Sequence, residues 1–154
     1  MAVHTRLALE PFDPARELAA FLDGRDQDGA VVSFTGVMRG QGRDGQTLER
    51  LHLDWYPGMT EASIAKIAED TAARFSVSDV RVVHRCGDIQ PGEPIVFAAA
   101  AAPHRRAAFE ACDYLMDKLK TEAAFWKRED SASGSQWIDP SGKDRADAAR
   151  WSKL

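Results

Sequence analysis

Cysteine is scarce in this chain of 154 residues, and its two cysteines are not spaced as a CxxC pair. We therefore expect Cys86 and Cys112 to be reduced, buried small side chains rather than a disulfide or a metal pair. A long apolar run is also missing, because the longest one, 95–102, is far too short to cross a membrane. The N-terminus lacks the charged start and apolar run of a secretory signal. These absences predict a cytoplasmic protein.

An excess of positive charge is absent as well. The formal net charge is −4, which gives no global field for nucleic acid or an anionic membrane, so any anion site must be a local pocket. Hydrophobic residues make up 44% and charged residues 29% of the chain, the profile of a globular protein. The length predicts one domain, covering residues 1–154, with a sizeable core.

The periodicity of the sequence predicts an α+β fold. Run 95–102 is continuously apolar, as in a central strand covered on both faces. Asp13 and Thr60 are expected N-caps. The expected strands are 3–9, 29–39, 51–55, 80–85, 95–102, 125–128 and 135–138, and the expected helices are 14–22, 60–75, 104–120 and 143–151.

A stretch from Pro103 to Glu129 organises the rest of the chain. It opens with the cationic cluster 104–106 and continues without Gly or Pro as a helix, with apolar residues at three- and four-residue spacing that predict one buried face: Phe109, Cys112, Met116 and Leu119. Cations in a first helical turn oppose the helix dipole. Together with free backbone N–H groups they favour a bound anion, although this stretch alone leaves ordinary surface arginines as an equal alternative.

His104 and Lys120 are too far apart on this helix to share a small ligand. Sixteen residues at about 1.5 Å each separate them by about 24 Å along the axis, and they lie about 160° apart around it. If both serve one ligand, a second copy of the chain must supply one of them. On the conditions that this helix forms and that both residues serve one ligand, the sequence predicts a homodimer with shared sites.

Four positions carry both a functional and an ordinary interpretation. Arg39 ends an expected strand beside the glycine-rich loop 40–45, which suits a ligand contact, but its immediate surroundings favour a solvated arginine. Lys120 and Lys127 flank an apolar segment, yet they also fit solvated lysines at a helix end. His84 is expected to be a partly buried residue near a strand end rather than a catalyst.

Five segments have a specific pattern in combination: DGAVVSFTGVMRG (28–40), LHLDWYPGMTEASI (51–64), VHRCGDIQPGE (83–93), APHRRAAFEACDYLMDKLKTEAAFWKRE (102–129) and SQWID (135–139). Together they resemble the large, catalytic subunit of molybdopterin synthase. The similarity runs in order along nearly the whole chain. Departures are Val37 and Met38, where the family often has a basic residue and a valine, and Ala124, where a proline is frequent.

The resemblance implies an α/β-hammerhead-like fold with additional antiparallel strands. It implies a sulfurtransferase that inserts two sulfurs into cyclic pyranopterin monophosphate to form the dithiolene of molybdopterin. The sulfur comes from the C-terminal Gly-Gly thiocarboxylate of a small ubiquitin-like subunit. The implied assembly is a heterotetramer built on a homodimer of large subunits, with no metal or other cofactor in sulfur transfer.

The same resemblance assigns the site. Lys120 and Lys127 are the implied catalytic residues, and His104 and Arg105 are implied to come from the other large subunit. The implied substrate-binding residues are Val37, Met38, Arg39, His104, Arg105, Lys120, Lys127, Arg128 and Glu129. Fixed cations suit a cyclic phosphate, and sulfur carried by the partner explains why no cysteine nucleophile is needed.

Two other functions are alternatives for this sequence. A dimer that only docks a ubiquitin-like tail is one alternative, although a groove for that tail would not need Arg39, Lys120 and Lys127. A phosphate-ester hydrolase would need a metal cluster or an activated nucleophile, and the sequence shows no HxH, paired-carboxylate or Ser-His spacing.

Overall fold

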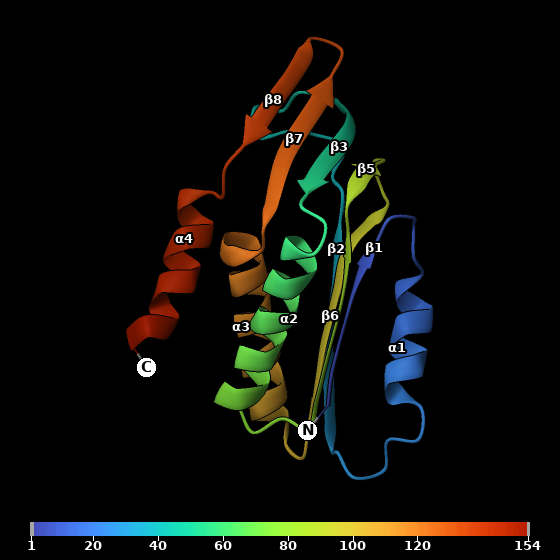
Figure 1. The fold of residues 1–154 in the computed structure, drawn as a ribbon, viewed down its shortest axis with the longest axis vertical. Helices are drawn as coiled ribbons and strands as arrows, with labels where there is room; N and C mark the ends of the chain where they lie inside the picture. The colour runs from blue at the N-terminus through green and yellow to red at the C-terminus, as the bar shows by residue number, and fades with distance from the viewer. Residues whose placement is uncertain (1, 154) are drawn as a thin grey trace.

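The computed structural model describes residues 2–153 and confirms the predicted α+β fold, with two four-stranded sheets. The first sheet has the order β1-β4-β6-β2; only β1 and β4 are parallel, and the other neighbours are antiparallel. Its strands form the lower two thirds of the molecule (Figure 1). They are β1 (Ala2–Ala8), β4 (Asp79–Arg85), β6 (Pro94–Ala102) and β2 (Ala30–Val37).

Strand β6 is the centre of the core, as its continuous apolar run predicted. Residues 96–102 are all buried, and alternate side chains face opposite sides of the sheet. Ala98, Ala100 and Ala102 belong to one apolar cluster, whereas Phe97 and Ala99 belong to another. The small alanine side chains allow helices to pack closely on both faces.

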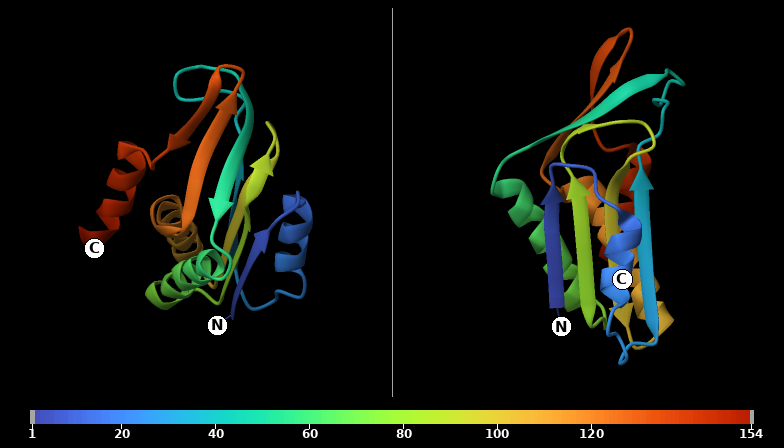
Figure 2. Two further views of the ribbon diagram at one scale, coloured as in Figure 1. Left: turned by 45° about the horizontal axis from the view of Figure 1, so that its top comes forward. Right: turned by 90° about the vertical axis from the view of Figure 1, so that its right-hand side faces the viewer.

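Three helices cover this sheet. Helix α1 (Pro14–Leu22) covers one face, and its predicted N-cap is confirmed because Asp13 accepts a hydrogen bond from the Ala15 N–H. Helices α2 (Met59–Arg74) and α3 (Arg105–Glu122) lie on the opposite face (Figure 2, right). In the view of Figure 1, β6 runs downward and α3 runs back upward. The start of α3 therefore lies at the bottom of the molecule, and its end lies beneath the second sheet.

The second sheet has the order β5-β3-β7-β8 and is antiparallel throughout. One face of it carries an apolar cluster of Met38, Leu48, Leu51, Leu53 and Ile89. Its shortest strand lies in a segment for which neither a strand nor a helix was predicted. The strands are β5 (Gly87–Ile89), β3 (Leu48–Trp55), β7 (Phe125–Ser131) and β8 (Gly134–Ile138).

Two local predictions were wrong. Gly58, with φ of 85°, caps α2, whereas Thr60 lies buried inside the helix and donates a 2.7 Å hydrogen bond to the Ala124 carbonyl. Phe109 is 59% exposed, because the buried stripe of α3 runs along a neighbouring line. The buried residues of α3 are Ala108, Ala111, Cys112, Tyr114, Leu115 and Leu119, so the predicted burial of Cys112 and Leu119 is confirmed.

The C-terminal segment folds back onto the helices. Helix α4 (Gly142–Ala149) continues into a 3₁₀ turn, η1 (Arg150–Lys153). Trp151 packs edge-on against Phe75 and Tyr114, and its indole N–H donates a 2.7 Å hydrogen bond to Asp117. Within residues 2–153, no helix is both long and apolar enough to span a membrane.

Both cysteines are buried and unpaired, as expected. Cys112 packs under α3 against the sheet, where burial raises the pKa of its thiol to about 12. Burial also raises the pKa of Cys86. Neither thiol is therefore prepared to act as a nucleophile near neutral pH.

Candidate functional site

Lys120 and Lys127 lie on either side of the junction where α3 passes into β7. Lys120 is exposed in the last turn of α3, and Lys127 lies between Leu53 and Ile138 on the inner face of the second sheet. Burial lowers the pKa of Lys127, and the charge of Lys120 lowers it further. The two lysines therefore occupy one electrostatic environment.

His84 lies beside these lysines at the end of β4. It is 8% exposed, and its ring stacks on Phe125 with centroids 4.4 Å apart. Its Nδ1–H donates a 2.8 Å hydrogen bond to the Arg85 carbonyl. Burial, and then the charge of Lys120, lower the pKa of His84 to about 4, so the ring is neutral near pH 7. The expected position at a buried strand end is confirmed.

Two residues at this end were not found by sequence reasoning. Arg43, in the loop between β2 and β3, donates a 2.9 Å hydrogen bond to the Asp139 carbonyl. Asp144 forms a capping box with Ser141 at the start of α4. Partial burial opposes ionisation of Asp144, but its contacts with Ser141 and the charges of Lys120 and Arg43 lower its pKa overall. The only signal in the sequence for Arg43 was its position as a lone arginine in the glycine-rich loop 40–45.

The three predicted site residues at the end of β2 and just beyond it differ in their exposure to solvent. Arg39 is exposed at the end of the sheet that Lys120 reaches, because β2 and α3 both run towards that end. Val37 is 50% exposed, whereas Met38 is 3% exposed and packs with Leu51 and the other residues of the inner cluster. Met38 therefore supports the site from the core rather than facing a ligand.

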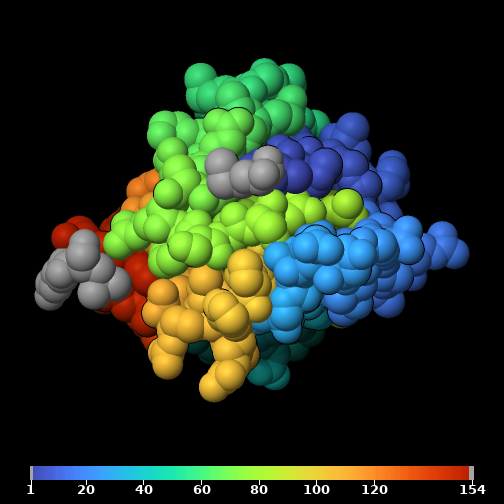
Figure 3. Space-filling model, turned by 90° about the horizontal axis from the view of Figure 1, so that it is seen from below, coloured from blue at the N-terminus to red at the C-terminus, as the bar shows by residue number. Residues whose placement is uncertain are grey.

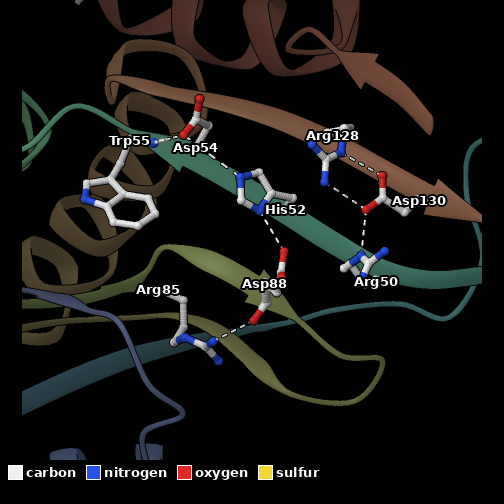
Figure 4. A network of polar contacts seen from close by, with 8 residues as sticks. All are labelled: Arg50, His52, Asp54, Trp55, Arg85, Asp88, Arg128 and Asp130. Atoms are coloured by element: carbon white, nitrogen blue, oxygen red, sulfur yellow. Dashed lines mark hydrogen bonds and ion pairs between the residues drawn. The ribbon is translucent and has the colours of Figure 1, made fainter.

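Arg128 and Glu129 lie on opposite faces of β7. Glu129 shares the inner face with Lys127, and its carboxylate lies close to Gly42. Arg128 lies on the outer face, where its Nε is 2.7 Å from Asp130, which also pairs with Arg50 (Figure 4). The structure does not bring Arg128 together with Lys127.

His104 and Arg105 lie at the other end of the molecule. His104 is the N-cap of α3, and the helix prediction for this stretch is confirmed. An open hollow of about 430 Å³ is lined here by Gly29 and by residues 103–106. Figure 3 views this end, where the start of α3 lies beside the segment leading into β2. Lys120, near the last turn of the same helix, is therefore about 24 Å from His104 along the helix axis.

Cationic side chains thus lie at both ends of α3: Lys120 near its end, with Lys127 on the following strand, and His104 and Arg105 at its start. The sequence matches the MoaE protein family over residues 7–122, and the chain belongs to this family.

Individual relatives and solved structures are similar to this chain over most of its length. The chain is 51% identical to the molybdopterin synthase catalytic subunit of Caulobacter vibrioides, over 92% of this chain and 93% of the relative. It is similar to the molybdopterin biosynthesis MoaE protein from Burkholderia ambifaria, with a TM-score of 0.81 and 38% identity over 97% and 98% of the two chains. Molybdopterin synthase from Staphylococcus aureus gives a TM-score of 0.77 and 30% identity over 86% and 94%.

Proposed function

We propose that this chain is the catalytic subunit of a cytoplasmic molybdopterin synthase. It transfers sulfur from the thiocarboxylated C-terminus of a small ubiquitin-like subunit to cyclic pyranopterin monophosphate. Membership of the MoaE family supports this activity. The structural observation that carries the site assignment is the shared environment of Lys120 and Lys127, in which burial and mutual repulsion lower the pKa of Lys127.

The chemistry requires positioned cations more than a protein nucleophile. The thiocarboxylate sulfur attacks a carbon of the precursor, so that a C–S bond forms while a C–O bond to the phosphate breaks. Lys120 and Lys127 stabilise the negative charge that develops on the departing oxygen. Water then hydrolyses the acyl–sulfur bond, which leaves sulfur on the product and a carboxylate on the partner.

Lysine suits this role because its ammonium can also give up a proton. Lowering the pKa of Lys127 by burial and by a neighbouring cation brings it closer to the range in which a general acid works. Lys120 is more exposed, and it is the residue that an incoming tail from outside can reach. We assign Lys120 to the partner's terminal glycine and Lys127, with Arg39, to the precursor.

A second copy of the chain completes the site. In an antiparallel two-fold dimer, the end of the molecule that holds Lys120 meets the end of its partner that holds His104. Exposed apolar side chains lie between these ends on two adjacent elements: Phe34 on β2 is 43% exposed and Phe109 on α3 is 59% exposed. Because β2 is also an edge strand, we propose that this β2–α3 face is the dimer contact.

A reconstituted reaction tests the function. The chain is mixed with thiocarboxylated partner and cyclic precursor, and the dithiolene product is measured. Lys120→Ala is expected to lower product formation about a hundredfold or more while keeping partner binding, because a positioned donor is lost. Lys118→Ala is the matched control, since Lys118 lies in the same turn and pairs with Glu122 at 3.1 Å.

Three outcomes separate the possibilities. Loss of product with Lys120→Ala and retention with Lys118→Ala support the assignment. Wild-type product formation by Lys120→Ala overturns the role of Lys120. Partner binding without any product from the wild-type chain would instead identify a docking module for the ubiquitin-like tail.

A further inference from the structure

We propose that Arg43 is an anion-binding residue of the same site. It is a third positively charged side chain, beside Lys120 and Lys127, and it binds the phosphate group of the ligand. The identity of that phosphate as the precursor's rests on the proposed function. The position of Arg43 does not, because it follows from the loop between β2 and β3.

The loop that carries Arg43 is built to hold it close to β7. Gly42 donates a 2.8 Å hydrogen bond to the Gln46 carbonyl, and the Asp44 carboxylate accepts a 3.0 Å bond from the Gln46 N–H. A Cβ on Gly42 would lie 3.3 Å from Glu129 Oε1, a distance that few real contacts reach. Glycine therefore lets the loop lie against the inner face of β7 on the Lys127 side.

The loop also reaches the segment that precedes α4. The Arg43 guanidinium donates its 2.9 Å bond to the backbone carbonyl of Asp139, a neutral acceptor. Among residues 2–153, Arg43 makes no ion pair in the structure. It thus retains a full positive charge with most of its five N–H donors free for a ligand.

The charge balance around Lys127, to which Arg43 contributes, favours an anion. Lys120, Lys127 and Arg43 contribute three positive charges, against the carboxylates of Glu129 and Asp144. The charges of Lys120 and Arg43 both act on Lys127 and on Asp144, so these groups form one cluster. Cations gathered without full compensation repel one another, and a bound phosphate relieves that repulsion.

Arginine adds geometry that the lysines lack. Its planar fork can donate two parallel hydrogen bonds to two phosphate oxygens, whereas a lysine ammonium acts as a point charge. When ring opening converts the cyclic phosphate to a monoester, the phosphate can gain a second negative charge, since the second pKa of a monoester is about 6. Arg43 would then release its hydrogen bond to the Asp139 carbonyl and donate to the oxygens of this dianion instead.

Phosphate binding tests this inference without the sulfur chemistry. Inorganic phosphate and the cyclic precursor are each titrated by calorimetry into the wild-type chain, Arg43→Ala, Arg43→Lys and the control Arg16→Ala. Arg16 lies on α1, far from the site, with a side chain that is 90% exposed. Arg43→Ala is expected to weaken both ligands by about tenfold to a hundredfold, the size of a lost charge-assisted bond, and Arg16→Ala should change neither.

The pattern of results is decisive in each direction. The inference is supported if Arg43→Ala loses more affinity for inorganic phosphate at pH 7.5 than at pH 5, because the Arg43 guanidinium then prefers the phosphate dianion. Arg43→Lys should recover only part of the lost affinity. Equal affinities of Arg43→Ala and wild type for both ligands overturn the inference even if the chain makes product. Phosphate binding that depends on Arg43 in a chain that never makes product would retain the anion site and reject the synthase function.

Discussion

The imidazole of His84 stacks on the ring of Phe125, with centroids 4.4 Å apart and planes 25° apart. This contact joins the end of β4 in the first sheet to the first residue of β7 in the second. Phe125 also packs against the apolar clusters of both sheets. The stack therefore fixes where β7 begins, and with it the position of Lys127 relative to Lys120.

His84 should make the stability of the chain depend on pH. Its pKa falls from 6.5 to about 4 in the folded chain, so between these values the unfolded chain binds the extra proton and stability is lost as pH falls. The gap of about 2.5 pH units corresponds to about 3 kcal/mol of stability, which is intact above pH 6.5, falls as pH is lowered and is fully lost below pH 4. Urea unfolding at pH 4 and pH 7 measures it.

The variant His84→Gln isolates this contribution. A glutamine amide can still donate to the Arg85 carbonyl but does not titrate. We expect the free energy of unfolding to fall less between pH 7 and pH 4 in His84→Gln than in the wild-type chain. Equal losses in the two proteins would show that His84 titrates normally in the folded state.

Lys127 should set the alkaline limit of precursor binding. Because burial and Lys120 lower the pKa of Lys127 below 10.5, its positive charge is lost at a lower pH than that of a free lysine. Precursor affinity in the wild-type chain should therefore fall as pH rises through this lowered pKa. Lys127→Arg stays charged and should remove that fall, even if its affinity at pH 7 is weaker. Superimposable pH profiles would exclude Lys127 as the titrating group.

The β2–α3 face should control assembly. Phe109→Glu places a charge in the proposed dimer contact, where burial without a partner is costly, so sedimentation should show monomers. Leu22→Glu, at the end of α1 and 48% exposed in the wild-type chain, is the matched control and should stay dimeric. A dimer that survives Phe109→Glu unchanged would place the contact on another face.

Strands and helices with strong patterns were predictable from the sequence. The apolar run of β6 predicted a strand covered on both faces, and helices do pack on both. Asp13 followed by Pro14 predicted the start of α1. These signals are local, so neighbouring residues alone carry them.

Features that depend on tertiary packing were not predictable. Thr60 has the chemistry of an N-cap, but its hydroxyl is used to bind the Ala124 carbonyl at the junction of α3 and β7. Phe109 fits a helical stripe with Cys112 and Leu119, yet in the folded chain its neighbour Ala108 is buried in its place. Arg43 approaches Lys127 through a loop whose path no local pattern encodes.

The division of the site between two copies is the central claim, and subunit complementation tests it most directly. His104→Ala and Lys120→Ala chains are each assayed alone, then unfolded and refolded together to mix the subunits, and product formation is measured with partner and precursor. Mixed dimers contain one intact site, so the refolded mixture should recover about one quarter of the wild-type rate while each variant alone stays nearly inactive. A mixture that dimerises but remains as inactive as its components would contradict the shared site.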